Sequence, residues 1–417
     1  MPFDVASVRA HFPSLTQGAA HFDGPGGSQT PDVVGRAVAD TLTSAISNRG
    51  TVTASERHAE QVVTDCRAAL ADLLGADPHG IVFGRSATAL TYDLARTLAK
   101  DWGPGDEVVV TRLDHDANIR PWVQAAQAVG ATVRWVDFDP ATGELSADAV
   151  AAVLCERTRL VATTAASNLI GTRPPVCRVA DLAHEVGALH WVDGVHATAH
   201  ASVDLTALRA DFWTCSPYKF MGPHCGVLAA DPALLETLHP DKLLPSTDAV
   251  PERFELGTLP YELMAGTTAA VDFIASLAAG PETVAAQEST ASRPHHAAAP
   301  SSRRERIELG MKAVHAHERA LLDVLEPALR ALPGVTVHSN ARSRTPTLLF
   351  TVAGRDPQEI RGRLAERGIN APAGHFYAVE CSRHLGLGDS GGVRVGLAPY
   401  TSAADIDRLV DAMTEIA

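Results

Sequence analysis

Within DFWTCSPYKFMGPHCGVL, residues 211–228, one side chain does not match its surroundings. Lys219 lies among apolar, aromatic and small residues, a composition that predicts burial. A lysine in such a place can extend its amine to the surface, pair with a carboxylate, or keep a reactive amine whose pKa is lowered by loss of water. The third case would allow covalent chemistry through an imine. Other residues of the chain must decide among the three.

Polar side chains follow several short apolar runs that are rich in β-forming residues. After IVFG, Ser86 is expected to cap a helix whose first amides, at Ala87 and Thr88, can bind an anion. After EVVVT, His115 has a flat ring that can lie on a planar ligand. Each of these residues taken alone is more often a plain cap or a solvated loop residue, so only their combination is informative.

The remaining strand ends complete the combination. After RLVATTAAS, the amide of Asn168 can donate to a phenolate-like oxygen. Asp193 ends an apolar run, where a carboxylate is costly to bury unless it meets a cation such as a protonated pyridine nitrogen. Pyridoxal phosphate (PLP) needs a phosphate site, a stacking ring, a donor to its phenolic oxygen, a carboxylate at its ring nitrogen and an amine for a Schiff base. Together with Ser216 and Lys219, these residues therefore predict a PLP site.

The elements that must position these residues alternate along the chain. From about 81 to 230, β-rich runs lie between amphipathic helical patterns, which predicts a mostly parallel sheet with helices on both faces and a ligand beyond the carboxyl ends of its strands. A long helical pattern over 303–332, strand candidates at 335–339, 347–352 and 393–398, and two more helical patterns predict a small α+β domain. We expect a large domain over 20–285 and a small domain made of 1–19 and 303–417. The segment 279–302, rich in Ala, Ser and Pro, is expected to be a flexible surface loop, with 286–302 as the linker.

Composition excludes several classes of function. The chain of 417 residues has a formal charge of -14, which disfavours nucleic acid as a partner. It has no apolar run of the roughly 18 residues that a membrane span needs, and its start does not resemble a signal peptide, so we expect a cytoplasmic protein. The six cysteines form no CxxC pair, so neither a disulfide framework nor a metal site is predicted. No GxGxxG or GxxxxGK[ST] follows the first strands, which argues against a nucleotide-binding α/β protein.

The whole pattern resembles the fold-type I PLP enzymes of aminotransferase class V and, within them, the cysteine desulfurase and selenocysteine lyase branch. The resemblance runs from FDGPGG at 22–27 to VRVGLAPYTSAADIDRLV at 393–410. It implies an α/β fold with a mostly parallel seven-stranded sheet in the large domain and a small C-terminal α+β domain. Its most specific elements are DHDAN (114–118), SNLIGT (167–172), VDGVHA (192–197), SPYKFMGP (216–223) and FELGT (254–258).

The resemblance also implies a role for each matching residue. Lys219 would form the internal aldimine, Asp193 would pair with the pyridine nitrogen, and His115 would stack on the ring; these three are the expected catalytic residues. Arg394, with its planar fork, would bind the substrate carboxylate. Asn168 and His196 would form hydrogen bonds with the phenolic oxygen. The phosphate would be held by Ala87, Thr88 and Ser216, joined by Thr258 from the neighbouring subunit of a homodimer with a shared active site.

The chain departs from the desulfurase pattern at three places. Tyr218 replaces a histidine before the lysine, and His196 replaces a glutamine. The mobile loop that carries the nucleophilic cysteine of desulfurases reads GHFYA here, with Tyr377 at the cysteine position. Cys381 is four residues away and is expected to be a bystander. Since a persulfide requires a thiolate, Tyr377 cannot replace that cysteine in a sulfur relay.

We therefore predict a PLP-dependent enzyme that acts on an amino acid through an external aldimine, with Arg394 and Tyr377 facing the substrate. The chemistry we expect is desulfurase-like or of the C–S lyase type, without a persulfide relay. Transamination and epimerisation stay open, because they begin with the same external aldimine and removal of the Cα proton by Lys219. The alternative of another class is a catalytically retired PLP fold that serves as a binding module; the intact Lys219, Asp193, His115 and Arg394 argue against it.

Overall fold

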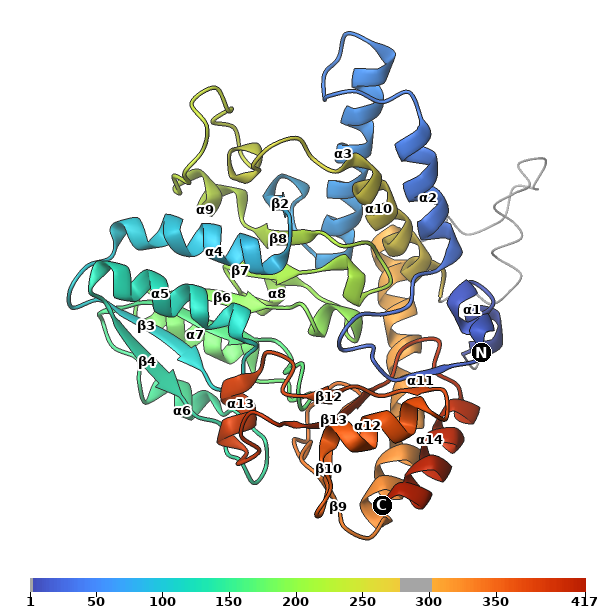
Figure 1. The fold of residues 1–417 in the computed structure, drawn as a ribbon. Coiled ribbons are helices and arrows are strands. Elements are labelled where there is room, and N and C mark those ends of the chain that lie inside the picture. Colours follow the sequence, from blue (N-terminus) through green and yellow to red (C-terminus); the bar gives the residue numbers. More distant parts are fainter. Residues whose placement is uncertain (1–2, 278–301) are drawn as a thin grey trace.

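The computed structural model describes residues 3–277 and 302–417, so most of the expected flexible loop, 279–302, lies outside the described residues. A seven-stranded sheet forms the centre of the large domain, with strand order β2-β8-β7-β6-β5-β3-β4 (Figure 1). Strands β3 to β7 run parallel, and β8 is antiparallel to both of its neighbours. The predicted mostly parallel seven-stranded sheet is thus confirmed. The strands are β2 (Ile81–Gly84), β3 (Glu107–Thr111), β4 (Thr132–Val136), β5 (Thr158–Thr164), β6 (Leu189–Asp193), β7 (Phe212–Cys215) and β8 (Gly226–Ala230).

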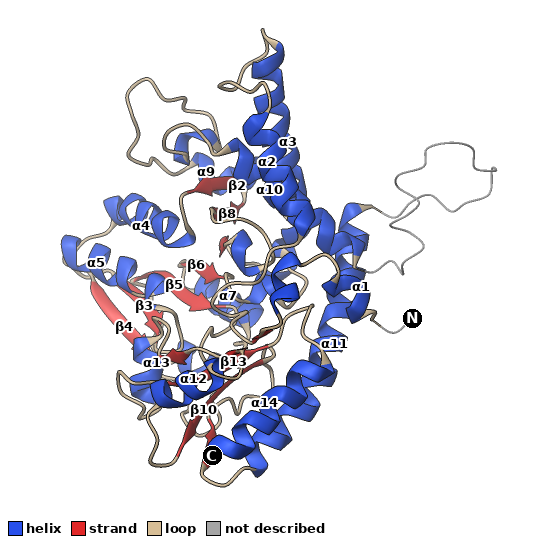
Figure 2. Ribbon diagram, turned by 45° about the vertical axis from the view of Figure 1, so that its right-hand side comes forward, coloured by secondary structure: helices blue, strands red, loops and turns tan. Residues whose placement is uncertain are grey.

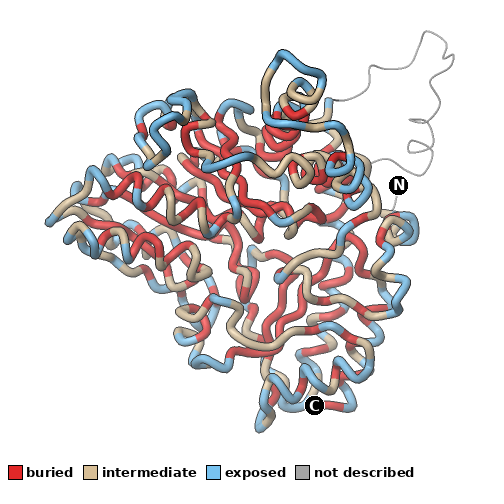
Figure 3. The backbone as a smooth tube through the Cα atoms, turned by 45° about the horizontal axis from the view of Figure 1, so that its top comes forward, coloured by how far each residue is buried: buried red, intermediate tan, exposed pale blue. Residues whose placement is uncertain are grey.

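Helices cover both faces of this sheet, as the burial of alternate strand residues requires. On β3, Val108 and Val110 pack against one group of helices, whereas Val109 packs on the opposite face. At the sheet edge, β4 is exposed or half-buried along most of its length, while β3 is buried throughout. Figure 3 shows buried stretches mainly in the interior and exposed ones mainly along the outline of the molecule. The large-domain helices are α2 (Asp32–Thr43), α3 (Ala54–Leu74), α4 (Ala87–Leu98), α5 (Arg120–Val129), α6 (Ala147–Ala151), α7 (Val176–Glu185), α8 (Leu205–Leu208), α9 (Pro232–Glu236) and α10 (Tyr261–Ser276).

The small domain is α+β, as predicted, and its four-stranded sheet is antiparallel with order β12-β13-β10-β9 (Figure 2). The long helix α11 begins with a capping box between Ser302 and Glu305, packs on α3 and α10, and continues to β9 and α14, so it belongs to both domains. The elements are α11 (Arg303–Ala331), β9 (Val335–Val337), β10 (Thr347–Val352), α12 (Pro357–Ala365), β11 (Ile369–Asn370), β12 (Ala373–Gly374), α13 (Val379–His384), β13 (Gly392–Gly396) and α14 (Ala403–Ile416).

The first residues of the chain contact both domains. In and after α1 (Val5–Arg9), Val8 and Phe12 pack into the apolar core that also holds β7 and α10. Ala20, in β1 (Ala20–His21), packs in the small-domain core, where β1 pairs with β11. The domain limits expected from the sequence stay a prediction. Among the described residues, no helix is long and apolar enough to cross a membrane.

Candidate active site

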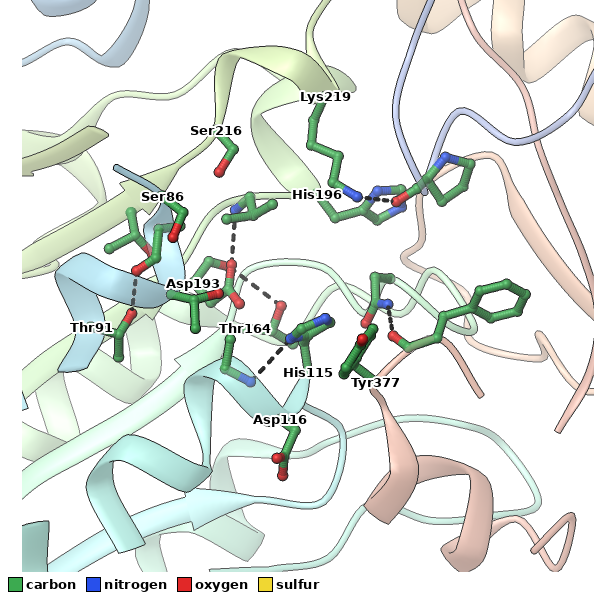
Figure 4. A pocket seen from close by; sticks show the side chains of 18 of the residues that line it. Ser86, Thr91, His115, Asp116, Thr164, Asp193, His196, Ser216, Lys219 and Tyr377 are labelled. Carbon is green, nitrogen blue, oxygen red and sulfur yellow. Dashed lines mark hydrogen bonds between the residues drawn. The ribbon is translucent and has the colours of Figure 1, made fainter. Parts of the chain in front are cut away.

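A cavity of about 600 Å³ lies beyond the carboxyl ends of the parallel strands, where residues of the small domain close over the sheet (Figure 4). All the site residues expected from the sequence line it except Thr258: Ala87, Thr88, His115, Asn168, Asp193, His196, Ser216, Lys219, Tyr377 and Arg394. They converge because parallel strands present their carboxyl ends at one edge of a sheet. The structure therefore brings the residues of the predicted site together.

Lys219 lies in a short turn after β7 with its amine inside the cavity. Its Nζ donates to the carbonyl oxygen of Pro25 and lies 4.9 Å from the centroid of the Tyr218 ring. Burial is the main cause that lowers the pKa of Lys219 to about 7; the charge of Arg394 adds to this effect and that of Asp193 opposes it. Within the described residues, Lys219 has no carboxylate within ion-pair distance. The reactive amine is the one of the three sequence alternatives that this geometry fits.

Asp193 ends β6 and is buried. Burial raises the pKa of its carboxyl to about 6, although the Val195 amide, which donates to Oδ1 at 2.9 Å, and the charge of Lys219 both lower it. The next residue must be glycine, because a Cβ on Gly194 would lie 2.0 Å from the Trp213 ring. A cation placed against this carboxylate would restore its ordinary pKa.

His115 lies in a turn after β3 that is held by hydrogen bonds within its own segment. Its Nδ1 accepts from the Ala117 amide at 3.0 Å, which leaves the proton of the neutral ring on Nε2. Burial, followed by the charge of Lys219, lowers the pKa of His115 to about 4, so the ring is neutral at neutral pH. Behind it, the fully buried Asp114 accepts from Thr111 and, at 2.6 Å, from Asn118. Sequence reasoning gave Asp114 no role of its own, although it is the first residue of the motif DHDAN.

The start of α4 has the features of an anion site. Ser86 caps the helix, with its Oγ accepting from the Ala89 amide at 3.1 Å. In the described part of the chain, the amides of Ala87 and Thr88 donate to no other group. The turn lies directly against β8, where a Cβ on Gly226 would lie 2.3 Å from the Ser86 carbonyl carbon. Two free amides at a helix N-terminus, beside the buried Ser216 hydroxyl, are suited to a phosphate.

Two residues expected at the phenolic oxygen are also bound to the small domain. The Nδ2 atom of Asn168 donates to the carbonyl oxygen of Phe376 at 3.0 Å, and its Oδ1 is buried without a partner in the described residues. The Nε2 atom of His196 lies 2.9 Å from the hydroxyl of Thr345 and 3.0 Å from that of Thr347. No local sequence pattern indicates these contacts, because they join segments far apart in the chain.

Arg394, on β13, is a buried cation in need of an anion. Only 2% of it is exposed, and it forms no ion pair with any described residue. Its Nη1 donates to the Asn168 carbonyl oxygen at 2.9 Å, and its Nε has no partner among the described residues. The guanidinium carbon lies 3.7 Å from the centroid of the Phe376 ring. Burial lowers the pKa of Arg394 to about 9, so it stays charged at neutral pH. A carboxylate is the natural partner for its planar fork.

The loop GHFYA, residues 374–378, is held in place over the cavity. Phe376 and Tyr377 have φ of +51° and +60°, which non-glycine residues adopt only where their surroundings enforce it. The Asp116 amide donates to the Tyr377 carbonyl oxygen at 2.8 Å. In α13, which follows the loop, Glu380 pairs with Arg112 at 2.6 Å. The Tyr377 side chain is 72% exposed, and its ring centroid lies 5.5 Å from that of His115.

Cys381 and Thr258 both lie outside this cavity. Cys381 is fully buried in α13, packed in the apolar core with Val109 and Leu349, and burial raises the pKa of its thiol. Thr258 is exposed at the surface, two residues after the exposed Leu256. Whether Thr258 serves a second subunit stays a prediction.

The N-terminal segment is a part of the site that sequence reasoning did not assign. Pro25 and Gly26 line the cavity, and the Pro25 carbonyl oxygen holds the amine of Lys219. A Cβ on Gly26 would lie 3.1 Å from the Asp23 carbonyl oxygen and 3.2 Å from the Arg394 Nη2, a tight fit that favours glycine here. Both residues belong to the motif FDGPGG at 22–27.

Comparisons with known proteins agree with this geometry. The family model described as aminotransferase class-V matches residues 20–308 and 304–409. An uncharacterized protein of Mycobacterium tuberculosis is 34% identical, over 100% of each chain. A probable cysteine desulfurase of Mycolicibacterium paratuberculosis is 31% identical over 100% of this chain and 58% of its own length. A crystal structure of the cysteine desulfurase CsdA (S-sulfonic acid) from Escherichia coli superposes with a TM-score of 0.84 at 26% identity and covers 100% of this chain and 98% of that one.

Proposed function

Since the chain belongs to the class V aminotransferase family, as its sequence predicted, we propose that it is a PLP-dependent enzyme that acts on an amino-acid substrate. One observation carries the proposal. A single cavity holds a buried amine, a buried carboxylate, two free helix amides and a buried arginine without a carboxylate partner in the described chain. A binding module that had lost its chemistry would have no need to keep both the amine and the unpaired arginine buried.

The residues present fit PLP. The amides of Ala87 and Thr88 would hold the phosphate together with Ser216, and the raised pKa of Asp193 suits a carboxylate that meets a pyridinium nitrogen. Asn168 and His196 would address the phenolic oxygen, and the neutral ring of His115 would lie against the pyridine face. When bound, PLP supplies an electron sink for the substrate α-carbon.

The chain's own groups would bind the substrate and move its proton. Arg394 would bind the substrate carboxylate through its free donors, and Phe376 fixes the plane of the guanidinium. Lys219, with a pKa of about 7, can accept a proton from the α-carbon and return it at neutral pH, whereas an ordinary lysine stays protonated. Tyr377 would cover the outer side of the cavity.

We propose desulfurase-like or C–S lyase chemistry in which the C–S bond breaks by elimination and the sulfur leaves directly as sulfide or a thiol, without an enzyme persulfide. Relatives and a neighbour in structure are named as cysteine desulfurases, yet Tyr377 stands in the loop over the cavity and Cys381 is buried in the core. A buried thiol with a raised pKa is a poor acceptor of sulfur. Transamination and epimerisation remain alternatives, since the same residues would serve their first steps.

We also propose a cytoplasmic homodimer that shares its active sites. Thr258 is exposed and does not line the cavity of its own chain, as a residue that reaches the phosphate of a second copy would require. All six cysteines are free, which suits a reducing compartment.

Borohydride reduction of the PLP-loaded protein tests the proposal. Peptide mapping should find the pyridoxyl group on Lys219 and not on exposed lysines such as Lys100, and label on another lysine would refute the site.

Since only a neutral amine attacks an aldehyde, cofactor uptake by the apoprotein should rise with pH and be half-maximal near pH 7, the pKa of Lys219. Half-maximal uptake near the ordinary pKa of lysine, about 10.4, would contradict the buried amine.

A further inference from the structure

His196 belongs to the large domain, but the small domain holds it. The ring is buried and lines the cavity, and its Nε2 lies 2.9 Å from the Thr345 hydroxyl and 3.0 Å from the Thr347 hydroxyl. Thr347 is the first residue of β10, and Thr345 lies in the loop before it. The two hydroxyls are 3.2 Å apart, so three polar atoms form a closed group on one side of the ring. Only Nδ1 remains for a ligand.

The ring is neutral, because burial, followed by the charges of His200, Lys219 and Arg394, holds the pKa of His196 well below its usual range. A neutral imidazole carries one N–H and one bare nitrogen. A phenolate oxygen can only accept, so a ring that binds it through Nδ1 must carry its proton there. Its Nε2 must then accept, and a hydroxyl can donate to it, which a backbone carbonyl cannot do.

We propose that Thr345 and Thr347 are positioning residues. The Thr345 hydroxyl donates to that of Thr347, and Thr347 donates to Nε2 of His196, which keeps the ring proton on Nδ1, where it is available to the phenolic oxygen of PLP. This inference rests on the proposed function. It makes the small domain part of the cofactor site, although neither threonine touches the cofactor.

The surroundings keep this group in place. Gly171 has φ of +77°, its carbonyl oxygen accepts from the Thr345 amide at 2.9 Å, and a Cβ there would lie 3.0 Å from the Thr345 Oγ1. On its other side, the ring of His196 meets that of His200 edge to face at 4.9 Å between centroids. His200 is itself held by the buried Glu318 of α11, at 3.0 Å from Nδ1. The ring of His196 therefore packs on a neighbour that is itself held in place.

The test compares holoenzymes that differ only in these hydroxyls. In the double variant Thr345→Val, Thr347→Val, we expect the dissociation constant of PLP, measured by equilibrium dialysis, to rise roughly tenfold, the scale of one lost hydrogen bond. We also expect the visible absorption band of the bound cofactor to shift. The double variant with serine at both positions should restore both properties. Thr351→Val is the matched control, because it removes a similar contact, 3.0 Å from Nε2 of His338, on the same strand and away from the cavity.

A His196→Ala background separates positioning from general packing. There, the two valines should cause no further loss of PLP affinity, since the ring they act through is gone. An equal loss in both backgrounds would overturn the inference, and so would wild-type affinity and an unshifted band in the valine variant. A wild-type protein that binds no PLP would instead refute the proposed function itself.

Discussion

Two sides of the cavity are built differently. Asp193 is the last residue of β6, and Lys219 and His115 come from turns after β7 and β3 of the same mostly parallel sheet, so each is placed by its own segment. Arg394 and Tyr377 come from the small domain and reach the cavity only because that domain packs on the large one. The strand-end side carries Lys219 and Asp193, whose pKa values of about 7 and 6 lie near neutral pH. The small-domain side carries an arginine that stays charged, although burial lowers its pKa to about 9, and a loop with positive φ at two non-glycine residues. We therefore propose that the first side moves the proton and the second recognises the substrate.

The largest effect is expected on the strand-end side. Asp193→Asn should lower kcat by a ΔΔG‡ of about 3–5 kcal/mol, the scale for a buried charge that loses its partner, because an amide cannot keep a pyridinium protonated. The variant should still bind PLP through the amides at the start of α4. The dissociation constant of PLP, measured by dialysis, should therefore change little, although kcat falls. Asp106→Asn is the control, because Asp106 precedes β3 at the end of the strand that lies away from the cavity. This variant should keep the wild-type kcat. Normal turnover by Asp193→Asn would show that this carboxylate does not meet the ring nitrogen.

On the small-domain side, Arg394→Gln should act on KM more than on kcat. The loss of a charge-assisted bond to the substrate carboxylate is worth about 1.5–3 kcal/mol, or roughly 10- to 100-fold in kcat/KM. An amine that lacks the carboxylate is the matched control, because the wild type and the variant should treat it alike. If the variant discriminated between the two compounds as well as the wild type does, Arg394 would not be the carboxylate site.

The same contrast explains what the sequence could predict. Strand-end residues were found because an apolar run followed by a polar residue is a local pattern, and parallel strands bring such ends together. The partners of His196 and Asn168 could not be found, because Thr345 and the Phe376 carbonyl lie about 150 to 210 positions away and no local pattern marks them. The strands β11 and β12 were missed since two residues carry no periodicity. The long helix α11 was predicted because its pattern extends over many turns.

The smallest effects are expected at Tyr377 and Cys381, and they decide between a sulfur relay and direct release. Tyr377→Phe removes a hydroxyl from a side chain that is 72% exposed, so kcat/KM should change by no more than about threefold.

Cys381→Ala removes a buried thiol, which should cost about 1 kcal/mol of stability and leave turnover of cysteine nearly unchanged. Both variants should be assayed on cysteine, alanine and an S-substituted cysteine, with mass spectrometry during turnover. A persulfide on Cys381 would show that α13 and its loop leave the core to reach the cavity. The ion pair of Glu380 with Arg112 and the buried position of the thiol both oppose that movement, so we expect no persulfide.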